Sequence, residues 1–378
     1  MSLQTLQEKV RSAATQLLSE NLNVWNAASA GTLVMGSAVQ MKDLIETLSW
    51  GLISGLVVER NAFANAGTPA ERKVMAQLLA NSVRLDGRVG PLVITSGMLS
   101  KLNAGVGEIA ATVAAQAAQG MIDSYVKVGM GAANAAIQSG AYAGTVTTQV
   151  APIAGGRIPV GAKFPTLIDM ELATVVFGDQ TSNIKAWFMS GAQYTYFKAF
   201  GVLTNTEVLF KIDTVRIEQD ASGRRFVITD APALGDNIIG LSQSGVVVNA
   251  QALAMESDKV LGGENIEYIL QGEFSYDVAV KGYKLKSSAT ATAGSESFKQ
   301  ATLLNKANWE AIAKAGVDNP PASLDGAVPN IKGGGKGGST GVNTVQNAQT
   351  QPGYDVKETA GVILTLTPAA AAPAGGGE

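Results

Sequence analysis

Three carboxylates, Asp169, Glu171 and Asp179, are the side chains of this sequence that come nearest to an acid–base arrangement for catalysis. They lie on or just after the segment 164–175, whose apolar residues recur at helical spacing. Asp169 and Glu171 are two positions apart and therefore do not share a helical face. We interpret all three as solvated or ion-paired structural residues.

Metal binding and nucleophilic catalysis are restricted by the composition. The chain of 378 residues contains no histidine and no cysteine, which excludes serine–histidine triads, zinc-protease helices, disulfides and thiolate metal sites. Asp213, Asp220 and Asp230 lack the loop spacing of a calcium-binding helix pair. The sequence predicts no catalytic residue and no metal site, and leaves open only enzymes built on carboxylates, lysine, serine or tyrosine.

Two glycine-rich segments begin phosphate-binding patterns without completing them. In the segment 333–340, Gly337 follows Lys336 where a phosphate-binding loop needs serine or threonine, and no apolar strand comes before it. The Gly-Met-Gly of 129–131 has Asn134 in place of the third glycine and lies inside a helical pattern. We therefore interpret the first as a linker, discard the second, and predict no cofactor.

The composition favours a protein that associates with copies of itself. Hydrophobic residues make up 46% of the chain and charged residues only 16%, so much of the surface is expected to be covered by other subunits. The net charge is −3 and no cluster of Lys and Arg exists, which predicts no more than weak, non-specific proximity to nucleic acid. The longest apolar run, 48–58, is about half the roughly 20 residues that cross a bilayer. We expect no signal peptide, no membrane contact and no small-molecule substrate.

The N-terminal part predicts an arm. Residues 3–22 place apolar side chains at helical spacing opposite charged ones, which indicates an amphipathic helix, and 23–36 is predicted to be extended. Such an arm either packs on its own domain or straps neighbouring subunits together. If it is a strap, removing residues 1–22 impairs particle formation and leaves the subunit folded. Leu6, Val10 and Leu17 are its candidate assembly residues.

A long two-stranded excursion is predicted next. The strand-prone segments 50–60 and 73–94 are separated by a turn that contains Gly67 and Pro69. Isolated hairpins are marginally stable, so this one either packs on its own domain or needs a partner surface. The candidate assembly residues here are Trp50, Val58, Arg60, Phe63 and Arg84.

Helices and strands alternate over the rest of the chain, which predicts an α+β fold. A long helix is expected over 102–138, broken near Gly120, and a connection over 140–161. Two shorter helices are expected over 164–175, with Leu167, Ile168, Leu172 and Val175 at helical spacing, and over 192–200. A third is expected over 299–315 and carries Trp309, the last assembly candidate. Strands are expected over 184–190, 224–230, 237–248, 265–285 with a break at Gly272, and 356–367.

Six segments in this order resemble the major capsid proteins of tailed bacteriophages, which have the Hong Kong ninety-seven type of fold. They are 164–170 (FPTLIDM), 178–180 (GDQ), 184–190 (IKAWFMS), 223–232 (GRRFVITDAP), 302–310 (TLLNKANWE) and 357–364 (KETAGVIL). The resemblance extends from the N-terminal arm to Thr367. It departs from the family after Met189, where Ser190 and Gly191 stand in place of a His-Ser pair.

The resemblance implies a division of the chain into an arm, a loop, and peripheral and axial domains, with a spine helix in the peripheral domain. The segments are the arm (1–40), the extended loop and its flanks (41–101), the peripheral domain with its helix (102–163), the axial domain (164–255), the return to the peripheral domain (256–325), a glycine-rich insertion (326–355), a final peripheral strand (356–367) and a disordered tail (368–378).

The same resemblance implies a structural subunit that forms hexamers and pentamers of an icosahedral shell around phage DNA. The implied partners are copies of itself and, further, portal, scaffold and decoration proteins. The implied location is the virion, assembled in the cytoplasm of the host bacterium. A nanocompartment shell of the same fold and a carboxylate-dependent hydrolase stay open as alternatives. We expect no fused scaffolding domain, and a separate scaffold stays open.

Overall fold

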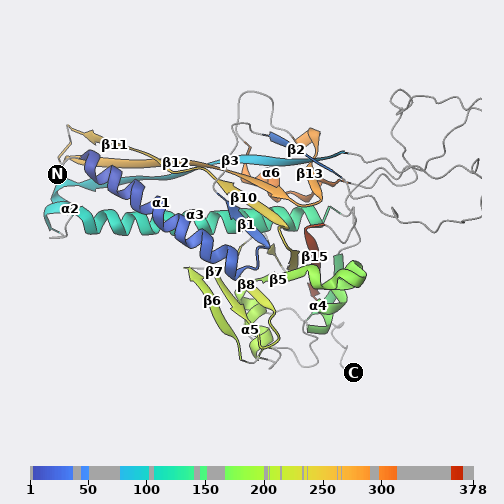
Figure 1. The fold of residues 1–378 in the computed structure, drawn as a ribbon. Coiled ribbons are helices and arrows are strands. Elements are labelled where there is room, and N and C mark those ends of the chain that lie inside the picture. The colour runs from blue at the N-terminus through green and yellow to red at the C-terminus, as the bar shows by residue number, and fades with distance from the viewer. Residues whose placement is uncertain are drawn as a thin grey trace, which may run out of the picture.

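The computed structural model describes residues 3–36, 44–50, 77–101, 106–139, 145–150, 167–199, 298–312 and 359–368, together with most of 203–289. Within 203–289, the positions left out are 204, 213–214, 232–233, 236, 262 and 265. Helices and strands mix along the chain, which confirms the predicted α+β class. Figure 1 shows one elongated layer of strands and helices above a second, shorter lobe.

The elongated layer is a six-stranded sheet. Its strands in order are β1 (Leu33–Gly36), β10 (Val246–Ala250), β12 (Glu267–Val280), β3 (Gln77–Thr95) and β2 (Leu44–Trp50), with β11 (Ala254–Val260) also paired to β12. Strand β3 lies almost wholly in the predicted strand segment 73–94, and it pairs with β2. The predicted first strand 50–60 and the turn after it lie outside the described residues except for Trp50, so the predicted hairpin stays a prediction. The predicted break at Gly272 is a shift of register between Leu270 and Gly272 inside the continuous strand β12.

A single long helix, α3 (Val106–Ile137), lies along this sheet (Figure 1). Tyr125 of α3 packs its ring against Phe274 and Tyr276 of β12, at centroid distances of 5.9 and 4.9 Å. The predicted break near Gly120 is wrong, because the helix runs through that residue. One glycine costs a helix about 1 kcal/mol, which the alanine-rich flanks and tertiary packing of α3 offset.

The N-terminal helix α1 (Leu3–Ala28) packs along α3 and β11 of the same chain. The helix predicted over 3–22 is confirmed, and the extended conformation predicted from residue 23 is wrong as far as Ala28. The helix continues because its apolar face continues for one more turn. The buried residues of that face are Leu6, Val10, Ala14, Leu18, Leu22 and Trp25.

The second lobe is built on a seven-stranded sheet. Its strands in order are β4 (Thr145–Val150), β15 (Gly361–Pro368), β9 (Asn237–Ser242), β5 (Ile184–Met189), β8 (Arg225–Ile228), β7 (Val215–Gln219) and β6 (Glu207–Ile212). Helices α4 (Leu167–Thr174) and α5 (Gly191–Ala199) and the 3₁₀ segment η1 (Val175–Asn183) complete the lobe. A separate core gathers around Phe177, Trp187 and Tyr194.

Most elements predicted for this lobe are confirmed, with one exception that matters for the architecture. The helices near 164–175 and 192–200 and the strands near 184–190, 224–230 and 356–367 are present with shifted ends. The single strand predicted over 237–248 is instead two strands, β9 and β10, in different sheets. Gly245 stands at the crossing, where an added Cβ would lie 2.6 Å from the Ala360 carbonyl oxygen. The strand β4 lies inside the predicted connection 140–161.

The helix predicted over 299–315 is also wrong. The chain forms α6 (Gln300–Leu304), a 3₁₀ turn η4 (Lys306–Asn308) and the strand β14 (Trp309–Ala311), which pairs with β13 (Tyr283–Leu285). The side chain of Asn305 accepts a hydrogen bond from the N–H of Ala307 at 3.0 Å, which competes with helix continuation. The short elements α2 (Ser96–Lys101) and η3 (Ser287–Ala289) complete the described structure. The glycine-rich insertion and the tail lie outside the described residues.

Candidate assembly surfaces

The N-terminal candidates Leu6, Val10 and Leu17 contact their own subunit. Leu6 and Val10 are 7% and 0% exposed, and Leu17 is partly buried against the same core. The structure therefore shows the alternative in which the arm packs on its own domain, and it corrects the expectation that these side chains reach a neighbour. An amphipathic pattern reveals an apolar face but not which chain covers it.

Trp309 is likewise a core residue. Its side chain is 1% exposed, and its indole N–H donates to the carbonyl oxygen of Leu303 at 2.7 Å. An assembly contact through Trp309 is therefore corrected as well, because β14 turns this side chain toward the interior of the first lobe. An isolated tryptophan in sequence carries no signal that separates core from interface.

Only some of the candidate assembly residues in the predicted two-stranded segment 50–94 lie in the described ranges. Arg84 of β3 forms an ion pair with Asp86 at 3.3 Å and donates to the Ser275 hydroxyl at 2.9 Å, so its charge is used within the subunit. Trp50 is the last residue of β2 and pairs with Gln77 of β3. Val58, Arg60 and Phe63 lie outside the described residues, and their assembly role stays a prediction.

Helix α1 connects the two lobes. Near its start, the Gln7 side chain donates to the Met255 carbonyl and accepts from the Ser257 hydroxyl of β11. At its end, Arg225 of the second sheet donates to the carbonyl oxygens of Ala27 and Ala28 at 2.6 and 3.0 Å. A cation at a helix C-terminus also interacts favourably with the helix dipole. The helix is thus held by the first sheet at one end and by the second at the other.

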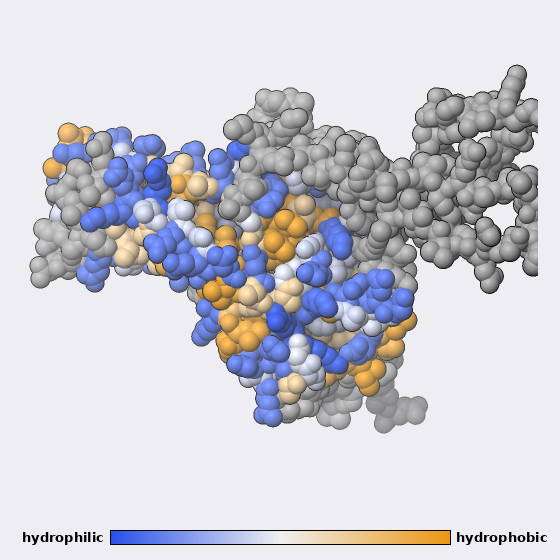
Figure 2. All heavy atoms as spheres, in the orientation of Figure 1, coloured by the Kyte–Doolittle hydropathy of each residue, from blue (hydrophilic) through white to orange (hydrophobic). Residues whose placement is uncertain are grey.

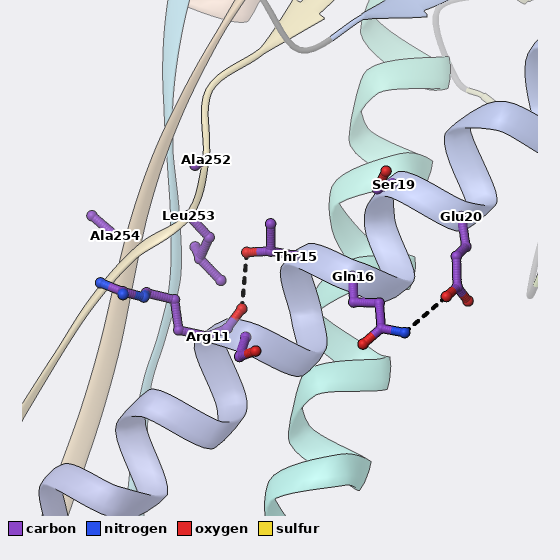
Figure 3. Close-up of a pocket in the computed structure, with 9 residues that line it drawn as sticks. Arg11, Thr15, Gln16, Ser19, Glu20, Ala252, Leu253 and Ala254 are labelled. Atoms are coloured by element: carbon purple, nitrogen blue, oxygen red, sulfur yellow. Dashed lines mark hydrogen bonds between the residues drawn. The ribbon is translucent and has the colours of Figure 1, made fainter.

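A shallow hollow of about 810 Å³ lies beside α1, against residues 252–254 (Figure 3). The Thr15 hydroxyl in its wall donates to the Arg11 carbonyl at 2.9 Å, and the Gln16 amide donates to the Glu20 carboxylate at 3.0 Å. These polar groups bond within α1 itself. The Thr15, Gln16 and Glu20 side chains are therefore engaged within the helix that forms one wall of the hollow.

Six apolar side chains are exposed at the free end of the long sheet, and we call them the tip patch. Thr95 of β3 and Val260 of β11 both pair with Glu267, which brings the three strands together at this end. Figure 2 shows apolar surface there, at the upper left. The tip patch consists of Leu92, Val93, Met98, Val260, Leu261 and Ile266, with exposures between 36% and 65%. It lies on both faces of the sheet end, because Leu92 and Val93 are consecutive in β3 and their side chains point to opposite faces.

A second exposed apolar surface, the α4 stripe, lies on the other lobe. It consists of Ile168, Leu172 and Val175, at 68%, 53% and 64% exposure. Ile168 and Leu172, four residues apart, share one face of α4, and Val175, the first residue of η1, follows three residues later. The opposite face of α4 is buried through Met170 and Ala173. Figure 2 shows apolar surface on the side of the lower lobe where Figure 1 places α4.

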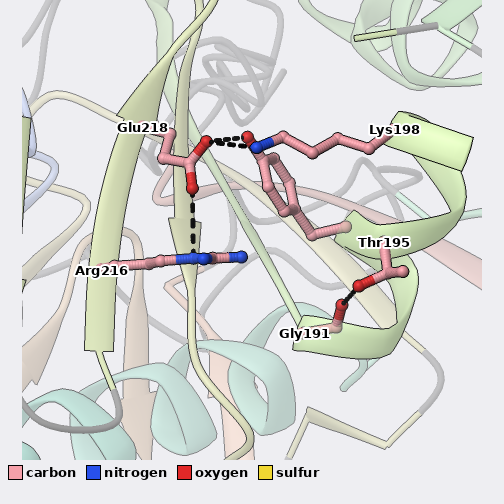
Figure 4. Close-up of polar contacts among 6 residues, drawn as sticks. Gly191, Thr195, Lys198, Arg216 and Glu218 are labelled. Atoms are coloured by element: carbon pink, nitrogen blue, oxygen red, sulfur yellow. Dashed lines mark hydrogen bonds and ion pairs between the residues drawn. The ribbon is translucent and has the colours of Figure 1, made fainter. Parts of the chain in front are cut away.

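A buried carboxylate fixes α5 to the second sheet (Figure 4). Glu218 of β7 is 2% exposed, accepts the Tyr194 hydroxyl, and lies 3.0 Å from the Lys198 ammonium and 3.2 Å from the Arg216 guanidinium. Burial alone would raise the pKa of Glu218, but hydrogen bonds from Tyr194, Thr206 and Lys198 and the charge of Arg216 lower that pKa overall. The carboxylate therefore stays ionised and acts as a structural link.

The buried carboxylates of the described ranges do not converge. They are Glu218 and Asp277, which lie in different sheets. Burial raises the pKa of Asp277, and hydrogen bonds from Asn249 and Ser82 offset this only in part. Over the same ranges, no three acidic, histidine or cysteine side chains lie close enough together to hold a metal ion. The acid–base arrangement that a carboxylate-dependent hydrolase needs is not formed by these two groups.

The other carboxylates singled out in the sequence have local roles. Asp220 accepts backbone N–H groups across the turn 220–224, and Asp230 accepts the first backbone N–H of α5 at 2.8 Å. Glu171 forms an ion pair with Arg224 at 2.7 Å. Asp213 lies outside the described residues.

The glycine pattern at 129–131 serves the packing of α3 against the first sheet. A Cβ on Gly129 would lie 3.0 Å from Leu33 and 3.3 Å from Val248, so the glycine allows α3 to approach the first sheet closely. The segment 333–340 lies outside the described residues. No helix in the described part of the chain combines the length and apolar content needed to cross a bilayer.

Several solved structures are similar to this chain at low identity. A structure from Mycobacterium phage Adephagia is 11% identical with a TM-score of 0.40, over 70% of this chain and 85% of that one. The capsid of Ralstonia phage GP4 is 10% identical with a TM-score of 0.39, over 66% and 83%. The capsid of cyanophage P-SCSP1u is 10% identical with a TM-score of 0.38, over 66% and 84%. These likenesses are too distant to carry an argument by themselves.

The comparison of sequences with a protein family is decisive. No curated protein matches the chain. The model of the Gp13-like family, described as major capsid protein 13-like, matches residues 2–318. That match spans both lobes and confirms the resemblance to major capsid proteins. The chain therefore belongs to the major capsid protein 13-like family and is a capsid subunit.

Proposed function

We propose that this subunit assembles with copies of itself into hexameric and pentameric capsomers, which close into the icosahedral head of a tailed phage around double-stranded DNA. The observation that carries the proposal is the pair of exposed apolar surfaces on a family member, the tip patch and the α4 stripe. Contiguous exposed apolar surface on a soluble protein marks sites of interaction with other proteins.

The two surfaces lie on different lobes, so one copy can contact more than one neighbour at once. A shell needs heterologous contacts, in which the rotation that relates one subunit to the next closes the assembly. A subunit with separate contact surfaces can make such contacts. Each contact is modest in area, and the joint engagement of several contacts supplies the stability of the assembly. The interior of such a shell needs no strong attraction to DNA, in line with the net charge of −3.

The domain division follows the two sheets in this proposal. The six-stranded sheet with α3 as its spine would form the peripheral domain, and the seven-stranded sheet with α4 and α5 the axial domain. Since β10 pairs in the first sheet, the boundary would fall between β9 and β10, not at residue 255. The final strand β15 would belong to the axial domain, because it pairs with β4 and β9.

The proposal extends to partners and location through the resemblance of the sequence to tailed-phage capsid proteins. Portal, scaffold and decoration proteins would be further partners, and assembly would take place in the cytoplasm of the host bacterium. The subunit would have no enzymatic activity. Neither a nanocompartment shell nor a hydrolase is favoured by the family match.

Electron microscopy and light scattering of the purified protein test the proposal. The native chain is expected to form closed shells or capsomer rings, and a stable monomer at all concentrations would contradict the function. Burying an Ile or Leu is worth about 1.5–3 kcal/mol, so the double variant Ile168→Ser/Leu172→Ser should assemble at least roughly tenfold less well.

The matched control replaces two exposed valines that lie outside both surfaces. Val24 and Val208 are 50% and 54% exposed, so Val24→Ser/Val208→Ser removes a similar amount of exposed apolar surface. Assembly of the control should equal that of the native chain. Undiminished assembly of the α4 variant would remove the α4 stripe from the proposal and leave the function itself standing.

A further inference from the structure

A pocket of about 330 Å³ lies where the two lobes meet, and we call it the junction pocket. One wall belongs to the second sheet, through the start of β5 and the end of β9, and the other includes the residue that directly follows β12 of the first sheet. Every lining residue is polar or cationic, and none is acidic. The lining residues are Asn183, Lys185, Ser242, Gln243, Ser244 and Lys281.

The two ammonium groups of the junction pocket have no counter-charge among the described residues. Neither Lys185 nor Lys281 forms an ion pair or a side-chain hydrogen bond there. The carboxylates on the adjoining elements η1, β12 and β14 are Asp179, Asp277 and Glu310, and none of them lines the pocket. Glu310 pairs with a lysine of β13 at 3.1 Å. The six lining residues therefore carry a formal charge of +2.

A β-bulge in β5 places Lys185 at the pocket. The pairing of β5 with β9 advances by two residues on β5, from Ile184 to Ala186, and by only one on β9. The extra residue breaks the alternation of side chains along the strand. Ile184 can therefore pack against the core of the second lobe, while the next side chain, Lys185, stays exposed in the wall of the pocket.

Hydrogen bonds between segments that are distant in sequence hold the backbone around the pocket. The Lys281 N–H donates to the Gly245 carbonyl at 2.9 Å, and the Lys281 carbonyl accepts the Ala360 N–H at 2.9 Å. The Ser242 N–H donates to the Ala360 carbonyl at 2.8 Å. The walls are thus fixed before a ligand arrives, so binding costs little ordering of the backbone.

We propose that the junction pocket binds a phosphate group of the DNA that the shell encloses. The inference rests on the proposed function, and it adds the site through which a subunit of net charge −3 contacts a polyanion. Lysine binds phosphate as a point charge, and a hollow lined by one sign of charge concentrates its field.

The arrangement of the donors favours phosphate over a carboxylate of a neighbouring subunit. Lys185 comes from β5, Gln243 from the turn after β9, and Lys281 from the end of β12, so the donors belong to three separate segments. A phosphate group offers acceptor oxygens on several sides, whereas the two oxygens of a carboxylate lie in one plane. The lining also lacks the apolar wall on which the stem of a neighbour's side chain would pack.

Removal of both charges provides the experiment. The pocket variant is Lys185→Gln/Lys281→Gln, and the anisotropy of a short fluorescent DNA duplex is followed as unassembled subunit is added. At low salt the variant should bind DNA at least about tenfold more weakly than the native chain, because it releases fewer counterions. The slope of log affinity against log salt concentration should become shallower by about 1 for each phosphate contact that is lost.

Two further variants separate the charge of the pocket from general effects. Lys185→Arg/Lys281→Arg keeps both charges and should bind DNA to within about threefold of the native chain. The matched control Lys9→Gln/Lys211→Gln removes two exposed lysines outside the pocket and should bind to within about twofold. An equal loss of affinity in the control and the pocket variant would overturn the proposal, because the attraction would then belong to the whole surface.

Inorganic phosphate separates the anion from the polymer. At constant ionic strength, phosphate in place of chloride should raise the melting temperature of the native subunit and not that of the pocket variant. If it does so while both chains bind DNA equally, the pocket holds free phosphate and the assignment to DNA is wrong. Without phosphate the melting temperatures of the two chains should agree, which shows that the variant is folded.

A pocket variant that binds DNA and phosphate as the native chain does would overturn the phosphate site. Loss of particles by that variant would then assign the pocket to a carboxylate of a neighbouring subunit. A native chain that does not bind DNA would also overturn the inference. All these outcomes leave the proposed function intact as long as the native chain forms shells, and failure of the native chain to assemble would instead contradict that function.

Discussion

Replacement of Trp25 by alanine tests whether α1 is part of the core of its own subunit. The Trp25 side chain is fully buried, its ring meets that of Phe210 edge-on at 5.4 Å, and its indole N–H donates to the Leu33 carbonyl at 3.0 Å. Truncation of a buried Trp to Ala costs about 3–5 kcal/mol. The whole stability of a domain is about 5–15 kcal/mol, so this loss would be a large part of it.

A second variant separates the volume of the ring from its hydrogen bond. Trp25→Phe keeps most of the aromatic contact with Phe210 but leaves the Leu33 carbonyl without its donor, a loss of about 1–3 kcal/mol. The neighbouring Val24 is 50% exposed, and Val24→Ala should change the stability by less than about 0.5 kcal/mol. The three variants thus form a graded series at adjacent positions.

The assay is urea unfolding of the unassembled subunit, separated by gel filtration and followed by far-ultraviolet circular dichroism. Circular dichroism is preferred to fluorescence because two of the changes remove a fluorophore. The midpoint should fall most for Trp25→Ala, less for Trp25→Phe and hardly for Val24→Ala. If Trp25→Ala loses particle formation while its free energy of unfolding stays within about 0.5 kcal/mol of the native value, α1 packs on a neighbour and the reasoning is refuted.

Three further variants test single positions. Glu218→Gln removes an ionised group whose pKa is lowered in the folded state. The native chain should therefore lose stability as the pH falls from the ordinary Glu value of 4.5 through the lower folded pKa. Acid unfolding curves of the variant should lack that loss of stability. Gly120→Ala should raise the stability by roughly 1 kcal/mol, since nothing lies within 4 Å of the added Cβ in a helix interior. Gly361→Ala should lower the stability by about 1–3 kcal/mol or more, because its Cβ would lie 1.9 Å from the Gly240 carbonyl oxygen; equal melting temperatures of the two glycine variants would contradict this pair.

The helical segments with long periodic patterns were predictable, and their surroundings were not. The periodicity of 3–22 and of 102–138 predicted α1 and α3, but it identified an apolar face without its partner. Leu6 and Val10 were expected at a subunit contact and lie in the core. Ile168 and Leu172 formed an apolar face in the sequence, and the structure exposes them. A core and a subunit interface are built from the same apolar residue types, so the sequence pattern alone cannot tell one from the other.

The expected effect of an N-terminal truncation changes for the same reason. Removal of residues 1–22 was expected to leave a folded subunit. That expectation is incompatible with the burial of Val10, Ala14 and Leu18 against α3, because the truncation would uncover the helix along its length. The truncated chain should be destabilised before any question of assembly arises.

Several strands could not be assigned from local sequence. Trp309 lies in a helical pattern, yet β13, more than twenty residues earlier, pairs with its segment as a strand. The segment 237–248 is continuous in its apolar character, and only the packing of Ala360 beside Gly245 shows why it divides between two sheets. The hairpin β6–β7 was missed, although Phe210 and Ile212 in one strand, and Val215 and Ile217 in the other, alternate with polar residues and carry a strand signal.

The position of β15 has a consequence for the biosynthesis of the subunit. This strand lies between β4 and β9 inside the second sheet, and about 120 residues separate it from β9 along the chain. At about 5–20 residues per second, the ribosome needs roughly 6–24 s to make that stretch. Until then β9 presents an unpaired edge, the kind of surface that invites incorrect pairing with another nascent chain. Completion of this sheet, and with it entry of the subunit into assembly, is therefore timed by the synthesis of β15 and not by that of β9.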